Sequence, residues 1–236
     1  MLEALEVMVS QKARKANCSE DGLTLIECLV AIVVIALTTA TVTPMMVFAV
    51  ATRVQNQRAE QALQLAQGEI DKVRLVVEQG GDYGDRLKAL SLIAASPSIT
   101  SAIQVDPPTA FVAGTGSVAN ITQARKVDID GDGDSDFAIQ LFRTKGIELS
   151  PQIAGVVNNT PIVFEVGARV YDIQAERNLG SLQSAPADLT FTSGEGGRGR
   201  RPLAALYSQV AQGDREGSLC QYWQFTGITP ANLQCN

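Results

Sequence analysis

The longest pattern in the chain is an apolar run that extends from Cys28 to Ala51 without a formally charged residue. An α-helix rises ~1.5 Å per residue, so about 20 apolar residues suffice to cross ~30 Å of hydrocarbon. The run exceeds that length and predicts a membrane-spanning helix. Pro44 lies inside it and removes a backbone hydrogen bond, which predicts a kink or a local unwinding of the helix.

Beyond Ala51 the apolar residues recur at spacings of three and four, which is typical of an amphipathic helix. This stripe consists of Ala59, Leu63, Ala66, Ile70, Val73 and Val77. The other face is expected to carry Arg58, Glu60, Glu69, Asp71, Lys72 and Arg74. Gly80 and Gly81 predict the end of the helix near Gln79. The stripe favours packing on a sheet, and a free coiled coil is the alternative.

The rest of the chain shows strand patterns. Residues 82–121 contain several prolines and glycines and predict a connection with little regular structure. Strands are predicted at Gln123–Ile129, Phe137–Arg143, Pro161–Gln174, Ala187–Thr192 and Leu203–Val210. Short turns between them favour an antiparallel sheet. The predicted fold class is therefore α+β, with a long N-terminal helix packed on an antiparallel sheet.

Composition narrows the function classes. The 236-residue chain has a formal net charge of −6 and contains no histidine. Because the chain is acidic, a nucleic-acid partner is not expected. The lack of histidine excludes His-based triads and His metal ligands. No nucleophile with a matching base can be argued from the sequence, so we do not expect an enzyme.

The segment before the apolar run is polar and lacks the apolar core of a secretory signal peptide. Lys12, Arg14 and Lys15 are expected to hold it in the cytoplasm by the positive-inside rule. The junction with the run reads Gly22-Leu23-Thr24-Leu25-Ile26-Glu27. An unpaired carboxylate at the head of a membrane helix is costly, so Glu27 indicates a function.

This junction and the apolar helix after it resemble the class III leader of type IV pilins and type II secretion pseudopilins. The resemblance implies that a prepilin peptidase cuts between Gly22 and Leu23 and N-methylates the new amine. The family most often has phenylalanine where Leu23 stands. It also implies that Glu27 of one subunit neutralises the Leu23 amine of its neighbour. Many type IV pilins have a proline at the distance of Pro44. An ordinary signal anchor is the alternative.

The resemblance further implies a domain organisation, partners and a location. Residues 1–22 would be the cleaved leader, 23–54 the transmembrane and assembly helix, 55–80 its amphipathic continuation, and 81–236 a β-rich globular domain. The partners would be other pilins or pseudopilins, the prepilin peptidase and the inner-membrane assembly platform. The subunit would cross the inner membrane once, with its globular domain in the periplasm, before it enters a pilus or pseudopilus.

An acidic loop between two predicted strands is a second candidate for chemistry. It contains Asp128, Asp130, Asp132, Asp134 and Asp136, which repel one another unless a cation is present. Its start matches the Asp-x-Asp-x-Asp-Gly of an EF-hand, but Ile139 stands where the bidentate glutamate is expected. The spacing resembles the calcium loops of β-propeller and adhesin repeats. That implies one Ca²⁺ on the side chains of Asp128, Asp130, Asp132 and Asp136 and the carbonyl of Asp134. A solvated acidic turn is the alternative.

The cysteines fall into two kinds. Cys220 and Cys235 would lie outside the membrane, where oxidation is favoured, and we expect them to form a disulfide. A loop of that size contributes ~3 kcal/mol in the chain-entropy model. Many pilins likewise close a C-terminal loop with a disulfide, and two reduced cysteines are the alternative. Cys28 is expected to be a packed thiol in the apolar helix.

Within the family, the segment from Gly22 to Arg74 and the acidic loop resemble cyanobacterial pseudopilins of hormogonium polysaccharide secretion. This narrower resemblance implies a role in polysaccharide export and gliding motility. One alternative is a minor pilin at a filament tip that binds surfaces or glycans through the acidic loop and the arginines of residues 194–201. Another is a membrane-anchored calcium-binding protein that never assembles.

Overall fold

The computed structural model describes residues 24–81, 83–114, 118–148, 160–187, 199–213 and 218–227. Contacts divide the chain into two compact units, Met1–Val50 and Ala51–Asn236. A single helix, α1 (Leu25–Glu78), contributes its first half to one unit and its second half to the other. The α+β class is confirmed, because a long apolar N-terminal helix is joined to a β-sheet.

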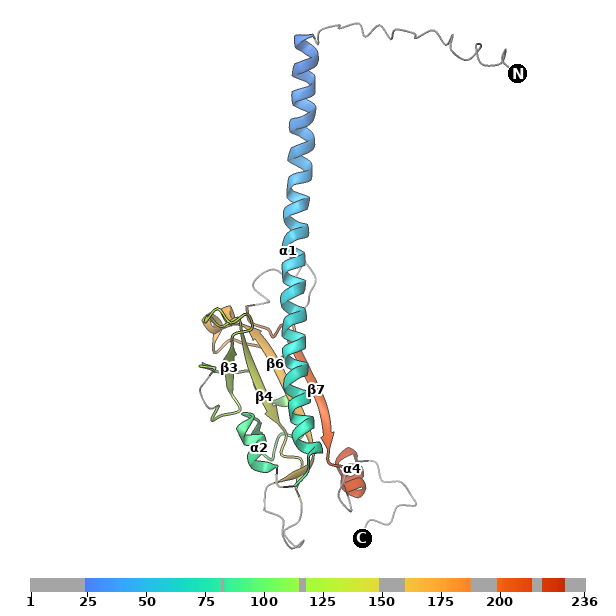
Figure 1. Cartoon of the computed structure of the whole chain (residues 1–236), viewed down its shortest axis with the longest axis vertical. Coiled ribbons are helices and arrows are strands. Elements are labelled where there is room, and N and C mark those ends of the chain that lie inside the picture. Colours follow the sequence, from blue (N-terminus) through green and yellow to red (C-terminus); the bar gives the residue numbers. More distant parts are fainter. Residues whose placement is uncertain are drawn as a thin grey trace, which may run out of the picture. The chain divides into compact units, whose positions relative to one another are not determined.

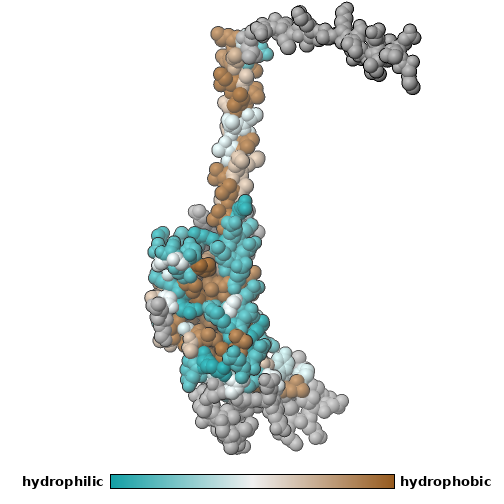
Figure 2. Space-filling view, in the orientation of Figure 1, coloured by the Kyte–Doolittle hydropathy of each residue, from teal (hydrophilic) through white to brown (hydrophobic). Residues whose placement is uncertain are grey.

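The first half of α1 is apolar on all sides. Every described side chain from Thr24 to Val50 is exposed, and the helix is long and apolar enough to cross a membrane. Figure 2 shows apolar side chains along this half and mostly hydrophilic side chains on the face of the second unit turned to the viewer. The α-helix continues through Pro44, so the proline does not end it. The kink at Pro44 stays a prediction.

The second half of α1 packs on the sheet, as Figure 1 shows. Its buried apolar residues are Ala59, Ala62, Ala66, Ile70, Val73 and Val77. Leu63, which was expected in this stripe, is 39% exposed, because Ala62 takes the buried position. Glu69 was expected on the solvent face and is buried instead. The alternative of a free coiled coil is wrong, since this stripe shares a core with β-strands.

The sheet is mixed. In the described residues it has the strand order β2-β3-β4-β6-β5, with β1 on β4 and β7 on β6. Its strands are β1 (Ile93–Ala94), β2 (Ala110–Val112), β3 (Gln123–Val127), β4 (Phe137–Arg143), β5 (Ile147–Glu148), β6 (Pro161–Asp172) and β7 (Ala204–Ala211). The pairs that β3, β4, β5, β6 and β7 form with one another are antiparallel, as predicted. The short strands β1 and β2 pair in parallel with β4 and β3, which the sequence pattern did not indicate.

Short elements fill the connections. The segment 82–121 contains α2 (Gly84–Ala89) and the 3₁₀ turn η1 (Ala102–Gln104) besides β1 and β2. A second 3₁₀ helix, η2 (Ile173–Asn178), follows β6, and α4 (Ser218–Thr226) follows β7. Gly80 and Gly81 have positive φ angles of 65° and 72°, which end α1 as expected because glycine adopts that conformation without strain. The strand predicted at Ala187–Thr192 lies outside the described residues except for Ala187, which is not in a strand.

Both faces of the sheet are covered. Side chains alternate along a strand, so Val166, Ala168 and Val170 of β6 join the core under α1. On the opposite face, Ala102 and Val105 of the preceding connection pack with Phe142 of β4. The connection is therefore a lid of residues 95–106 over the second face.

Candidate functional site

The start of α1 is the first candidate site. Gly22 and Leu23 lie outside the described residues. Thr24 caps the helix, because its Oγ1 accepts a hydrogen bond of 3.3 Å from the backbone N–H of Glu27. Threonine followed three residues later by glutamate is the pattern of a capping box. The threonine at position 24 is therefore explained by its role as the N-terminal cap of α1.

Glu27 places a carboxylate in the apolar half of α1 without a partner among the described residues. Its side chain is exposed, and its carboxylate makes no hydrogen bond or ion pair with any residue that the structure describes. The next charged residue along the helix is Arg53. A carboxylate in a low-dielectric surrounding needs a cation or donors to be stable there. A partner for Glu27 in hydrocarbon must therefore come from outside the described part of this chain.

The other polar groups of the apolar half are internally satisfied. Thr38, Thr39, Thr41 and Thr43 donate their hydroxyls to carbonyls one turn earlier, at 2.7–2.9 Å for the shortest bond of each. A hydroxyl bonded in this way is tolerated in hydrocarbon, because no donor is left unpaired. Glu27 thus differs from these threonines, because its carboxylate has no partner among the described residues.

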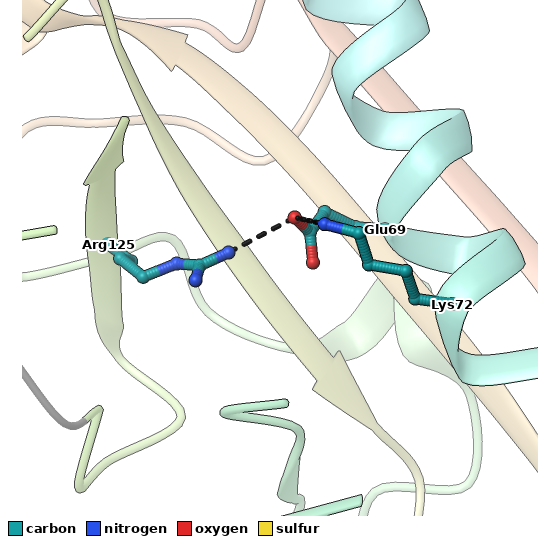
Figure 3. Close-up of polar contacts among 3 residues, drawn as sticks. All are labelled: Glu69, Lys72 and Arg125. Atoms are coloured by element: carbon teal, nitrogen blue, oxygen red, sulfur yellow. Dashed lines mark hydrogen bonds and ion pairs between the residues drawn. The ribbon is translucent and has the colours of Figure 1, made fainter. Parts of the chain in front are cut away.

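A second carboxylate of α1, Glu69, is treated differently (Figure 3). Its Oε1 accepts from Lys72 Nζ at 2.9 Å and from Arg125 Nη2 on β3 at 3.1 Å. The side chain of Glu69 is only 5% exposed, whereas those of Lys72 and Arg125 are 59% and 28% exposed. The buried acid is neutralised within the chain and joins the helix to the sheet. Two more polar contacts do the same: Arg58 binds Asp172 at 2.9 Å, and Arg74 donates to Ser208 Oγ at 2.7 Å.

The burial of Glu69 was not predicted from the sequence, although the position of this residue in α1 indicates it. Glu69 lies three residues after Ala66 and four before Val73, which places it on the stripe that those residues define. An acid at such a position predicts a buried partner. The identity of the partner, Arg125, is not readable from the sequence, because it depends on which strand packs there.

The acidic loop joins β3 to β4, and glycines shape it. Gly131 and Gly133 have φ angles of 79° and 96°, a region that side chains rarely adopt. Their backbone N–H groups donate to the two carboxylate oxygens of Asp128, at 2.7 and 2.9 Å. These two hydrogen bonds hold the pKa of Asp128 below its ordinary value. Asp136 accepts from the N–H of Ile129 at 3.0 Å and closes the loop.

Three of the five predicted ligands come together. One carboxylate oxygen from each of Asp128, Asp130 and Asp136 lies within 4.8 Å of the others. The hydrogen bond from the Asp132 N–H lowers the pKa of Asp130, but desolvation and repulsion by Asp132, Asp136 and Asp128 outweigh it, and the net pKa is raised. Mutual repulsion of this kind is what a bound cation relieves. Asp128 and Asp130 are exposed and Asp136 is half-buried, and exposed acids are common without an ion.

The remaining two aspartates lie outside this group of three. Asp132 Oδ1 accepts from the N–H of Asp134 at 2.8 Å, so it shapes the turn. Asp134 is exposed, and its side chain has no partner among the described residues. Oxygen donors alone fit a hard cation such as Ca²⁺. Three gathered carboxylates are fewer than the 6–8 oxygens that Ca²⁺ takes, so carbonyls or water would complete the set.

The cysteine predictions are only partly covered. Cys28 is a free, exposed thiol in the apolar half of α1. Cys235, the side chain of Cys220 and Arg198 lie outside the described residues, whereas Arg200 and Arg201 are described and Arg201 Nε donates to Gln183 Oε1 at 2.7 Å. Comparisons with family models, curated proteins and solved structures find no match to the chain. The architecture, a long apolar helix packed on a mixed sheet, is pilin-like.

Proposed function

We propose that the chain is a structural subunit of a type IV pilus-like or type II secretion-like filament, and that it has no enzymatic role. Its apolar helix would anchor it in the inner membrane before assembly and would line the filament afterwards. The observation that carries this proposal is Glu27, the one described acid of the apolar half, which lacks a partner within the described chain.

The proposed mechanism is electrostatic. Cleavage between Gly22 and Leu23 creates a new ammonium group four residues before Glu27. In a medium of low dielectric constant, attraction between an ammonium and a carboxylate is many times stronger than in water. Pairing the Leu23 amine of one subunit with Glu27 of the next removes two unfavourable charges at once. That pairing would fix the stagger between neighbouring subunits.

The second half of α1 supports an assembled state. Besides its buried stripe, it exposes large apolar side chains that the sheet does not cover: Val54 (48%), Leu63 (39%) and Leu75 (55%). These side chains are spread around the helix and form no continuous patch, but each leaves apolar surface that a neighbouring helix could cover. In a filament these side chains would pack on the helices of neighbouring subunits.

The proposal is tested by the fate of the N-terminus and by incorporation. Intact mass of the native protein should show a chain that begins at Leu23 with a methylated amine. Glu27→Ala should insert and fold normally but disappear from the sheared filament fraction. Glu60→Ala, which removes an exposed acid from the water-facing half of α1, is the matched control and should assemble. Normal incorporation of Glu27→Ala would favour the membrane-anchored protein that never assembles.

We further propose that the acidic loop binds one Ca²⁺ through Asp128, Asp130 and Asp136. The support is the gathering of their oxygens and the raised pKa of Asp130, to which desolvation and then repulsion from Asp132, Asp136 and Asp128 contribute. Calcium would supply the positive charge that the described loop does not contain. It would stiffen the junction of β3 and β4 rather than take part in a reaction.

The narrower role in polysaccharide export and gliding motility is also proposed on the resemblance alone. Deleting the gene should abolish both secretion of the polysaccharide and motility. Secretion with normal motility in the deletion strain would favour the minor pilin at a filament tip. The composition of the purified machine would identify the partner subunits.

A further inference from the structure

A cavity of about 580 Å³ opens on the second face of the sheet, at the margin of the lid of residues 95–106. Its walls are the lid from Pro97 to Ser101, the turn between β4 and β5, and the end of α4. Its volume falls within the ~300–1,000 Å³ of small-molecule sites. The pilin resemblance assigns no role to this place.

Glu165 of β6 is the central polar group of the cavity. Its Oε2 accepts from the backbone N–H of Ala102 at 2.6 Å and from Ser101 Oγ at 3.1 Å. Its Oε1 has no partner among the residues that the structure describes, and no described cation pairs with it. Half of this carboxylate therefore fastens the lid, and the other half is left available to a ligand on a wall of the cavity.

The wall around Glu165 is fixed by buried contacts. Arg169, two positions along the same face of β6, is fully buried and donates to the carbonyls of Ala102 at 3.3 Å and Val105 at 2.7 Å. Thr144 Oγ1 accepts from the N–H of Glu165 at 3.0 Å. Because these bonds hold the backbone of β6 and of the lid, and the lid in turn holds Oε2, a ligand would meet a preorganised acceptor at Oε1.

The turn between β4 and β5 forms another wall of the cavity. Gly146 has a φ angle of 69°, and a Cβ there would lie 2.1 Å from the carbonyl oxygen of Val163, so only glycine fits. The turn presents the exposed ammonium of Lys145, which has no partner in the described part of the chain. Gln209 of β7 and Gln224 of α4 add two exposed amides.

An aromatic ring completes the lining. Phe225 of α4 is half-buried and packs against Ile162 and Val163 of β6, which hold its position. The cavity thus combines one fixed carboxylate oxygen, one ammonium, two amides and one aromatic ring. The lining offers both hydrogen-bond donors and acceptors, and neither positive nor negative charge predominates in it.

From this combination we infer that the cavity binds a saccharide, with its hydroxyls on Glu165, Lys145 and the glutamines, and an apolar ring face on Phe225. A sugar hydroxyl both donates and accepts, so it suits a lining that offers both. A phosphorylated ligand would require a basic cluster, and the described lining contains one cation. A lipid would require an apolar lining, whereas polar side chains outnumber apolar ones here.

This inference goes beyond the proposed filament role and does not depend on it. A subunit that assembles through Glu27 need not bind sugar, and a sugar-binding domain need not assemble. Incorporation of the Glu27 variant and binding of saccharide by the cavity are therefore separate measurements, and either can fail alone.

The test uses the full chain in a detergent without a sugar head group, such as dodecylphosphocholine. Calorimetric titration with cellotetraose, maltotetraose and laminaritetraose should show that at least one binds. Glu165→Gln keeps an oxygen for the lid and replaces the open oxygen by an amide, so binding should weaken about 10- to 100-fold, as expected for a lost charge-assisted hydrogen bond. Phe225→Leu keeps the apolar contact with β6 but loses the ring, and binding should weaken about 2- to 10-fold.

The control is Glu78→Gln, which changes an exposed acid at the end of α1 outside the cavity and should bind like the native chain. Circular dichroism melts confirm that each variant is folded. Failure of all three tetrasaccharides to bind overturns the inference, as does binding that Glu165→Gln and Phe225→Leu leave unchanged. Binding of tetra-alanine at the cavity in place of the saccharides would assign it to an extended peptide and would also overturn it.

Discussion

Glu27 and Glu69 are two carboxylates on one helix, and they are handled in opposite ways. Glu69 is buried under the sheet and shares one oxygen between Lys72 and Arg125. Glu27 lies in the apolar half and has no partner among the described residues. The comparison indicates that the chain neutralises an acid where its own fold supplies a cation. Where the described residues supply no cation, as at Glu27, the proposed assembly would supply it from a neighbouring subunit.

The largest expected effect separates the two acids by readout. Glu27→Gln should leave the melting temperature of the protein unchanged and lower its incorporation into filaments at least about tenfold, equivalent to ~1.4 kcal/mol or more. Glu69→Gln should do the reverse, because it weakens the ion pairs under the sheet but leaves the apolar half intact. Thermal melts and quantification of the filament fraction give both readouts. Equal incorporation defects in the two variants would remove the distinction.

The next effect asks which cation matters to Glu69. Arg125→Met leaves a buried carboxylate with only the exposed Lys72, so the free energy of unfolding should fall by ~1–3 kcal/mol. Lys72→Met removes the exposed partner and should cost less than ~1 kcal/mol. Denaturant unfolding of the full chain in detergent measures both. A larger loss for Lys72→Met would mean that Lys72, and not Arg125, is the main partner among the two contacts drawn in Figure 3.

The aspartates of the acidic loop are a third set of acids, and no described cation pairs with them. Adding Ca²⁺ tests whether a cation from solution stabilises them. At about 1 mM Ca²⁺ and a Kd of ~0.1 mM, binding should stabilise the protein by ~1.4 kcal/mol and raise its melting temperature by ~3–6 °C. Asp130→Asn should abolish the rise, whereas Asp134→Asn, outside the group of three, should keep it. Identical melts in calcium and in EDTA would contradict a calcium site.

The smallest effect is the pH dependence of that shift. Calcium competes with protons for Asp130, whose pKa lies above its ordinary value of 3.8. The calcium-induced shift is therefore full well above the pKa of Asp130 and is lost as the pH falls through it. The loss should begin at a higher pH than for an ordinary aspartate. Melts between about pH 7 and pH 4 should show this decline. A shift that stays constant to about pH 4 would argue against Asp130 as a ligand.

Much of the fold follows from local pattern. The uncharged run, the stripe and Gly80 and Gly81 predicted α1 to within one residue of its end at Glu78. The predicted strand Phe137–Arg143 matches β4, because five of its seven residues are apolar and leave a clear signal. β1 and β2 were not predictable, since strands of two and three residues are defined by the neighbours they pair with and not by their own pattern.

The candidate sites also differ in whether local sequence or distant contacts determine them. The acidic loop was visible because its aspartates are close in sequence, yet only the backbone geometry shows that Asp132 shapes the turn while Asp128, Asp130 and Asp136 converge. Glu165 gave no signal, because its partners Ser101 and Ala102 are more than 60 residues away along the chain. Contacts of that range depend on how the lid crosses the sheet, and no local pattern contains that information.

The way Arg169 holds the lid has a practical consequence. Its guanidinium reaches the main-chain oxygen of Ile103 at 3.2 Å, while the side chain of Ile103 is 64% exposed and takes no part in the contact. Exchanging that side chain for cysteine and attaching a dye would therefore leave the grip on the backbone intact. Such a dye would mark a backbone segment held by Arg169 and, in the proposed filament, would report the distance between subunits by energy transfer.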